Sequence, residues 1–161
     1  NGWSEQAEVF PVALSSAPNI LQIWGGGTGA SLIKGWASIP EGYVTHIPVS
    51  TLDRVTGHTI KGKRTLILVD IEGAELMMLQ GATQTLKNDI KPIWMIEITN
   101  TGNQPAGTSV NSTFTQIFEM FFEHGYRAVT ADSKEQEITQ RDVDQVIAGT
   151  KQLETYNFIF R

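Results

Sequence analysis

Cysteine is absent from this chain of 161 residues, and its absence removes several chemistries at once. Disulfide bonds, catalysis by a thiolate and metal sites built on cysteine sulfur are excluded. A cytoplasmic location is compatible with a chain that has no cysteine, and it is the location that we expect. The chain also lacks any apolar run long enough to cross a bilayer.

Positive charge is scarce. The chain has 17 Asp and Glu against 12 Lys and Arg, which gives a formal net charge of -5. Nucleic acids demand clustered lysine and arginine, whereas the basic cluster at residues 61–64 is short and contains a glycine. We interpret it as a solvated turn, and we expect neither a nucleic acid nor a membrane as a partner.

The beginning of the chain carries no start or export signal. Residues 1–5 contain neither an initiator methionine nor the basic and apolar regions of a signal peptide. We therefore expect that residue 1 is not the start of the natural gene product. The length predicts a single domain, residues 1–161, with a sizeable core.

Two apolar runs, each followed by an acidic residue, mark the centre of the chain. Residues 65–69 end at Asp70 and residues 93–96 end at Glu97, a pattern typical of strands buried on both faces. Apolar residues at helical spacing predict a helix over residues 74–86 between them. Further strands are predicted at residues 8–14, 20–24, 43–49, 126–129 and 156–160, and further helices at residues 114–122, ended by Gly125, and 141–147.

This alternation predicts the α/β class. The last two strands lie late and close together, which suits an open, mostly parallel sheet with one reversed strand near its edge.

The acids at the strand ends are the candidate site. Ligands of open α/β sheets bind outside the carboxyl ends of the strands, where Asp70 is expected to project. If the strand geometry continues for two more residues, Glu72 reaches the same side, and Gly73 allows a tight turn or a close ligand. If the two strands are neighbours, Glu97 opens onto the same crevice. Carboxylates there could orient a hydroxyl, act as a base or hold a divalent cation.

Structural interpretations stand beside these. Glu72 and Glu75 could merely start a helix, where the dipole favours carboxylates, and Glu97 could bind loop amides. Metal-assisted chemistry would use Asp70, Glu97 and Asn100 as oxygen ligands. We expect no metal, since the three histidines show no metal-binding spacing.

Several segments, taken in order, resemble the FkbM-type methyltransferase domain. The resemblance covers nearly the whole chain, and Thr-Leu-Asp followed by Asp-x-Glu-Gly-x-Glu is its most specific part. The matching segments are residues 9–14, 49–53, 66–75, 79–82, 94–98, 118–126 and 157–160.

The resemblance implies a class I methyltransferase (Rossmann-like) fold. It implies methyl transfer from S-adenosylmethionine to a hydroxyl of a small metabolite, sugar or polyketide-like acceptor. By the same analogy, the adenine would lie near Ala13, Leu14 and Ser15. The methyl donor would lie near Asp70 and Glu72, and Glu97 by the acceptor, which makes Asp70, Glu72 and Glu97 the catalytic candidates.

Three departures from the family pattern bear on function. The family often has lysine where this chain has Leu68, and histidine where it has Thr99. Members also carry an acidic strand and a glycine-rich turn upstream of residues 9–14, so we expect this chain to be the C-terminal part of the domain. Without that strand, residues 65–69 have an open edge, and open edges recruit partners. We predict that either residues 9–14 or a second chain closes this edge. If a second copy of the chain closes it, the protein is a homo-oligomer. The alternative function is therefore a non-catalytic binding or assembly module.

Residues 25–29 match the Gly-x-Gly-x-Gly turn of methyltransferases literally. The position of the preceding strand that usually holds an acid is Ile23, and Gly35 and Pro40 leave little room for a helix afterwards. We therefore predict a flexible hairpin or loop here rather than the cofactor turn.

Overall fold

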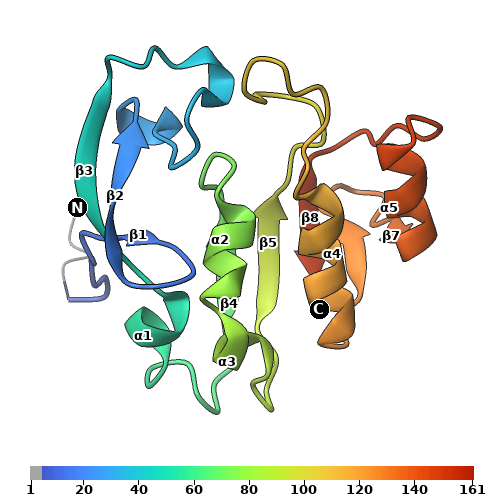
Figure 1. Ribbon diagram of the computed structural model, residues 1–161. Helices are drawn as coiled ribbons and strands as arrows, with labels where there is room; N and C mark the ends of the chain where they lie inside the picture. The colour runs from blue at the N-terminus through green and yellow to red at the C-terminus, as the bar shows by residue number, and fades with distance from the viewer. Residues whose placement is uncertain (1–4) are drawn as a thin grey trace.

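The computed structural model describes residues 5–161, which form two separate sheets (Figure 1). The three-stranded sheet has the order β1-β3-β2, with β3 parallel to β1 and antiparallel to β2. The five-stranded sheet has the order β4-β5-β8-β6-β7. The strands are β1 (Ala13–Leu14), β2 (Asn19–Trp24), β3 (Val44–Ser50), β4 (Leu66–Val69), β5 (Ile93–Glu97), β6 (Ala128–Thr130), β7 (Glu137–Ile138) and β8 (Asn157–Phe160).

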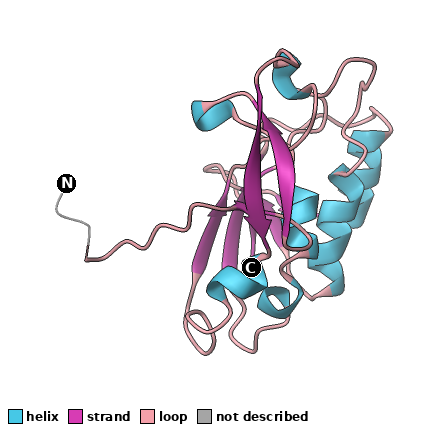
Figure 2. Cartoon of the chain, turned by 60° about the vertical axis from the view of Figure 1, so that its left-hand side comes forward, coloured by secondary structure: helices cyan, strands magenta, loops and turns pink. Residues whose placement is uncertain are grey.

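Helices cover one face of the five-stranded sheet, where α2 and α4 lie side by side (Figures 1 and 2). The helices are α1 (Leu52–Thr56), α2 (Glu75–Gln80), α3 (Thr83–Leu86), α4 (Phe114–Glu123) and α5 (Gln140–Ile147), with two 3-10 turns, η1 (Gly27–Gly29) and η2 (Trp36–Ser38). None of the helices between residues 5 and 161 is long and apolar enough to cross a membrane.

The α/β class is confirmed, but the predicted strand directions need correction. Strands β4 and β5 are parallel, and β8 is antiparallel to both of its neighbours, β5 and β6. The reversed strand β8 is therefore the third of five rather than near an edge, and β7 is reversed as well. The short loop between β6 and β7 favours their antiparallel pairing, because antiparallel strands can be joined by a tight turn whereas parallel strands need a long crossover.

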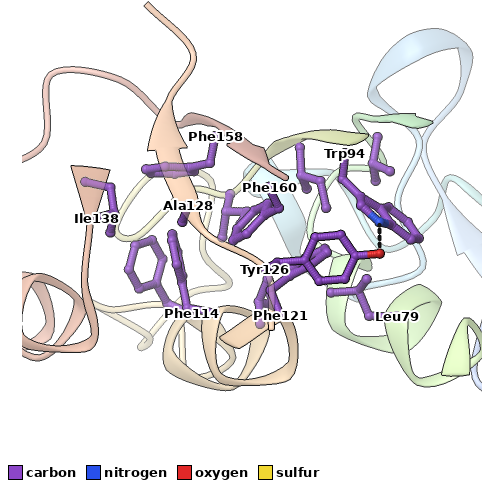
Figure 3. Packing of buried hydrophobic residues seen from close by; sticks show 14 of the residues in the cluster. Leu79, Trp94, Phe114, Phe121, Tyr126, Ala128, Ile138, Phe158 and Phe160 are labelled. Carbon is purple, nitrogen blue, oxygen red and sulfur yellow. Dashed lines mark hydrogen bonds between the residues drawn. The ribbon is translucent and has the colours of Figure 1, made fainter. Parts of the chain in front are cut away.

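The core lies between α4 and strands β5, β6 and β8, and aromatic rings fill it (Figure 3). Phe118 and Phe121 are completely buried, and Phe121 stacks on Phe160 with 3.8 Å between ring centroids. Positions three and four apart on α4 share one face, which is why its phenylalanines meet the sheet together. Gly125, at φ 73°, follows the helix end as predicted.

Strand β4 is buried on one face only, so the prediction of burial on both faces is wrong. Val69 is buried against the core, whereas Leu66 and Leu68 are 67% and 69% exposed. No described segment packs over the second face of β4 and β5, where Ile93 is also 46% exposed.

The edge of β4 is also unpaired within residues 5–161. Strand β1 lies beside β3 instead, with Ala13 opposite Val49, so the prediction that residues 9–14 close the β4 edge is wrong. The backbone amide of Ser15 donates to the carbonyl of Ser50 at 2.8 Å, which holds β1 against β3. Pairing by a second chain remains a prediction.

The single helix predicted for residues 74–86 is broken into α2 and α3 near Gly81. A Cβ at Gly81 would lie 2.2 Å from the carbonyl oxygen of Ser15, so the first strand packs directly on this break. The carboxylate of Asp53 accepts the amides of Gln84 and Thr85 at 2.8 and 2.9 Å and thereby caps α3. The backbone amide of Asp53 also donates to the carbonyl of Gly81 at 3.0 Å, so the Thr-Leu-Asp segment contacts the later Leu-Gln-Gly-Ala segment directly.

Candidate functional site

Two acids meet at the carboxyl ends of β4 and β5. The strands are parallel neighbours with Val69 opposite Ile96, so Asp70 and Glu97 leave the sheet side by side. Both line one small space, together with Glu72, Glu75 and Thr99. The condition set in the sequence analysis, that the two strands are neighbours, is met, and the three catalytic candidates line one space.

The loop after β4 turns in the left-handed region. Glu72 has a φ of 53° and Gly73 a φ of 93°. A glutamate in this conformation costs on the order of 1 kcal/mol or more, so surrounding contacts must hold it. The hydroxyl of Ser31 donates to the carbonyl of Glu72 at 2.6 Å, and the indole N–H of Trp36 donates to Oε2 of Glu72 at 2.7 Å. Both donors come from the long connection between β2 and β3.

Glu75 is the acid that the sequence analysis treated only as a helix start. Its side chain is 4% exposed, and its Oε1 accepts the amide of Gly73 at 3.0 Å. Burial raises the pKa of Glu75 to about 7, and the charges of Asp70 and Glu72 act in the same direction. The available signal was its position on α2, one helical turn before the buried Met78 and Leu79.

Glu97 is half-buried at the end of β5. Burial, followed by the negative charges of Asp70 and Glu72, raises the pKa of Glu97 above its usual value. A carboxylate with a raised pKa accepts a proton more readily than an ordinary glutamate does. The arrangement therefore offers a candidate base beside two further carboxylates.

A cavity of about 390 Å³ opens next to these acids. Its lining includes the acids Asp70 and Glu72 and the apolar residues Ala13, Leu14 and Ile23. The remaining lining residues are Val12, Gly27, Thr28, Ala30, Leu32, Ile71 and Ala74.

Four of the five residues predicted to bind the cofactor line this cavity, and the fifth does not. Ser15 is 3% exposed, its amide donates to Ser50, and it is not among the lining residues. The strand β1 that carries Ala13 and Leu14 ends just before it.

The glycine-rich segment after β2 is a loop, as predicted. It forms η1 and returns as a hairpin in which Trp24 and Ser31 exchange backbone hydrogen bonds, so no helix begins there. Its Gly27 and Thr28 nevertheless line the 390 Å³ cavity, a placement that the sequence analysis missed.

Histidines play no part in this region. The residues that the structure describes include no group of three or more His, Cys, Asp or Glu side chains placed to hold a metal ion.

Comparison with known proteins identifies the family to which the chain belongs. The family model described as "Methyltransferase FkbM domain" matches residues 7–128, which contain the acids and the cavity described above. Neither the curated proteins nor the solved structures gave a match. The chain belongs to the FkbM methyltransferase family.

Proposed function

We propose that the protein transfers a methyl group from S-adenosylmethionine to a hydroxyl of a small acceptor, such as a sugar, a polyketide-like compound or another metabolite. Family membership supports methyl transfer in general. The observation that carries the finer proposal is the cavity that joins Ala13 and Leu14 to Asp70 and Glu72, beside Glu97.

The lining of this cavity fits S-adenosylmethionine. The molecule has a flat apolar adenine and two positive charges, on the sulfonium and the ammonium. Ala13, Leu14 and Ile23 offer an apolar wall, while Asp70 and Glu72 offer carboxylates that attract the cationic part. A volume of about 390 Å³ lies within the common range of ligand pockets, which begins at about 300 Å³. The bound molecule would supply a methyl group that is already activated on sulfur.

The work left to the chain is to orient the acceptor and to remove its proton. Glu97 is the best placed base, because its pKa is raised and it lies next to Asp70 at the strand ends. In our proposal the carboxylate of Glu97 would take the proton of the acceptor hydroxyl as its oxygen bonds to the methyl carbon, while the bond from that carbon to sulfur breaks and S-adenosylhomocysteine leaves as a neutral thioether. Asp70 and Glu72 hold the donor side by charge.

A second cavity, of about 340 Å³, supports a polar acceptor. It begins at Asn100 and Thr101, just beyond Glu97, and extends to Gln152 and Tyr156. Its amide and hydroxyl groups beside an aromatic ring, together with the side chain of Lys151, suit a ligand that carries several hydroxyls.

Calorimetry tests the proposal. We expect S-adenosylmethionine and S-adenosylhomocysteine to bind the protein in its natural length, and the same titration shows whether residues 1–161 suffice. Glu72→Ala should weaken binding about tenfold or more, as expected when a charged contact is lost. Asp89→Ala is the matched control, since Asp89 is exposed in the turn before β5. A natural-length protein that binds neither compound contradicts the proposal.

Glu97→Gln separates binding from chemistry. It should leave the affinity for S-adenosylhomocysteine within about threefold and lower the rate of methyl transfer by a factor of about 100 or more, since a positioned base contributes this much. Equal rates in Glu97→Gln and the parent would remove Glu97 from the proposed role.

The second candidate is an assembly module, and the structure of β4 favours it. Within residues 5–161, β4 is paired on one side only, and its Leu66 and Leu68 are exposed. Unpaired edges with apolar side chains recruit other strands, here one from a second copy of the chain. Light scattering tests this candidate: a monomer at every concentration excludes it, and a dimer that Leu68→Lys dissociates supports it.

A further inference from the structure

We propose that Trp36 is a positioning residue that fixes the carboxylate of Glu72 at the wall of the 390 Å³ cavity. The functional meaning of this role rests on the proposed function, in which Glu72 holds the donor side. The contact itself can be tested separately.

The hydrogen bond between the two side chains is the first observation. The indole N–H of Trp36 donates to Oε2 of Glu72 at 2.7 Å, and Trp36 is only 4% exposed. Hydrogen bonds to an ionised acceptor are about twice as strong as those between neutral groups. Oε1 of Glu72 has no hydrogen-bond partner among the described residues, so one carboxylate oxygen is held while the other remains for a ligand in the cavity.

The absence of a side chain at Gly73 leaves the space that the indole ring of Trp36 occupies. A Cβ at Gly73 would lie 2.6 Å from two ring carbons of Trp36, closer than such atoms ever approach. The glycine also has a φ of 93°, in the left-handed region. The absent side chain at residue 73 therefore does more than ease a turn: it lets a tryptophan from a distant segment reach Glu72.

The segment that carries Trp36 is itself anchored on a second loop. The amide of Ala37 donates to the carbonyl of Asn103 at 2.8 Å, and a Cβ at Gly35 would come within 3.4 Å of the side chain of Pro105. Trp36 thus bridges the loop that follows β4 and the loop that follows β5. It also lines the small space that holds Asp70 and Glu97. Its indole therefore holds the carboxylate of Glu72 where the 390 Å³ cavity and this smaller space meet, since Glu72 lines both.

The first test measures binding rather than turnover. Trp36→Phe keeps an aromatic ring but removes the N–H donor, and we expect the Kd for S-adenosylhomocysteine to rise about tenfold in calorimetry. In a Glu72→Ala background the same substitution should change the Kd less than twofold, because the two residues act through one bond. Trp94→Phe is the matched control: it removes the indole bond to the Tyr126 hydroxyl in the core, and it should leave the Kd within twofold. A parental Kd in Trp36→Phe overturns the proposal.

The second test reads the contact directly and requires no bound ligand. In an ¹⁵N–¹H spectrum, the indole N–H signal of Trp36 should move when Glu72 becomes glutamine. A packing role alone would not produce this movement, and Glu72→Gln leaves Trp36 in place even if Trp36→Phe fails to fold. An indole signal that stays unmoved in Glu72→Gln overturns the proposal.

The two proposals fail in different ways. A parent protein that binds no S-adenosylhomocysteine ends the proposed function, and the indole signal then decides the positioning role by itself. A parent that binds the compound, with unchanged affinity in Trp36→Phe, ends the positioning role and leaves the proposed function intact.

Discussion

The two sheets of the molecule differ in how many of their side chains are buried. In the five-stranded sheet, the face under α4 is sealed by completely buried rings, among them Phe118, Phe158 and Phe160. In the three-stranded sheet, β2 has no buried residue and β3 has one, Val49. Since burial of a large apolar side chain contributes about 1.5–3 kcal/mol, most of the stability lies in the first region. The candidate site nevertheless uses both.

Because of this difference, the acids of the candidate site and one wall of its cavity lie in regions of unequal packing. The acids Asp70 and Glu97 end strands of the well-packed sheet. One wall of the cavity, including Ala13 and Ile23, belongs to the sparsely packed sheet. At the candidate site, the bonds from Ser31 and Trp36 to Glu72 join the two regions. We therefore expect the cavity wall on the donor side to be less stable and more mobile than the strand ends that carry the acids.

The largest loss of stability is expected for a substitution in the well-packed core under α4. Phe118 is completely buried and lies against the rings of Phe114, Phe158 and Phe160. Phe118→Ala should lower the free energy of unfolding by about 3–5 kcal/mol, because it removes apolar burial and leaves a cavity. Urea denaturation measures the loss. Ile20→Ala, in β2 at 68% exposure, is the counterpart and should change it by less than about 0.5 kcal/mol. Equal losses would contradict the comparison.

The next effect is a pH dependence at the junction of the two regions. The pKa of Glu75 is raised from 4.5 to about 7 in the folded protein, mainly by burial. Between these values the folded state holds the proton that the unfolded state releases. The stability from this group is therefore complete below pH 4.5 and is lost as the pH rises through about 7. The full difference corresponds to about 3 kcal/mol.

Substitution of Glu75 should abolish this dependence. Gln cannot ionise and can still accept the amide of Gly73, so the stability of Glu75→Gln relative to the parent should rise by about 3 kcal/mol between pH 4.5 and 8. Denaturant titrations at several pH values measure this difference. Glu75→Leu loses the bond to Gly73 and should be less stable than Glu75→Gln, yet it should show the same relative pH slope. A difference that stays constant with pH would refute the assignment.

A smaller effect tests the link between α1 and α3. The carboxylate of Asp53 accepts two backbone amides and the hydroxyl of Thr85, which lies at 2.8 Å. Asp53→Ala leaves these donors without their partner and should cost about 2 kcal/mol. Thermal and urea denaturation measure it, with the exposed Asp89→Ala as a control expected to cost under about 0.5 kcal/mol. A loss no larger than that of the control would mean that water replaces the cap.

The same contrast explains what could be predicted from the sequence. The acids at the ends of β4 and β5 were found because apolar runs reveal buried strands, and parallel neighbours share an edge. The contact between Trp36 and Glu72 was missed because it joins side chains 36 residues apart. No local periodicity encodes such a contact. The raised pKa of Glu75 was missed because it depends on burial, which the residue pattern of α2 indicates only weakly.

The exposed face of β4 was misjudged for a related reason. An apolar run shows that a strand is compatible with burial, but it cannot show that both faces find a partner within the chain. Leu66 and Leu68 have the same residue type as core positions and are nevertheless exposed.

The smallest expected change in stability is that of Leu68→Lys, which can be compared with a substitution of its neighbour in the same strand. Leu68 is 69% exposed, whereas its neighbour Val69 is 6% exposed against the core. Leu68→Lys should change the free energy of unfolding of the monomer by less than about 0.5 kcal/mol, while Val69→Lys buries an unpaired charge and should cost more than about 3 kcal/mol. Denaturation at low protein concentration compares the two. If Leu68→Lys destabilises the protein only at high concentration, the exposed face is covered by a second copy, because association links stability to concentration. A large loss at every concentration would instead mean that a segment of the same chain covers Leu68.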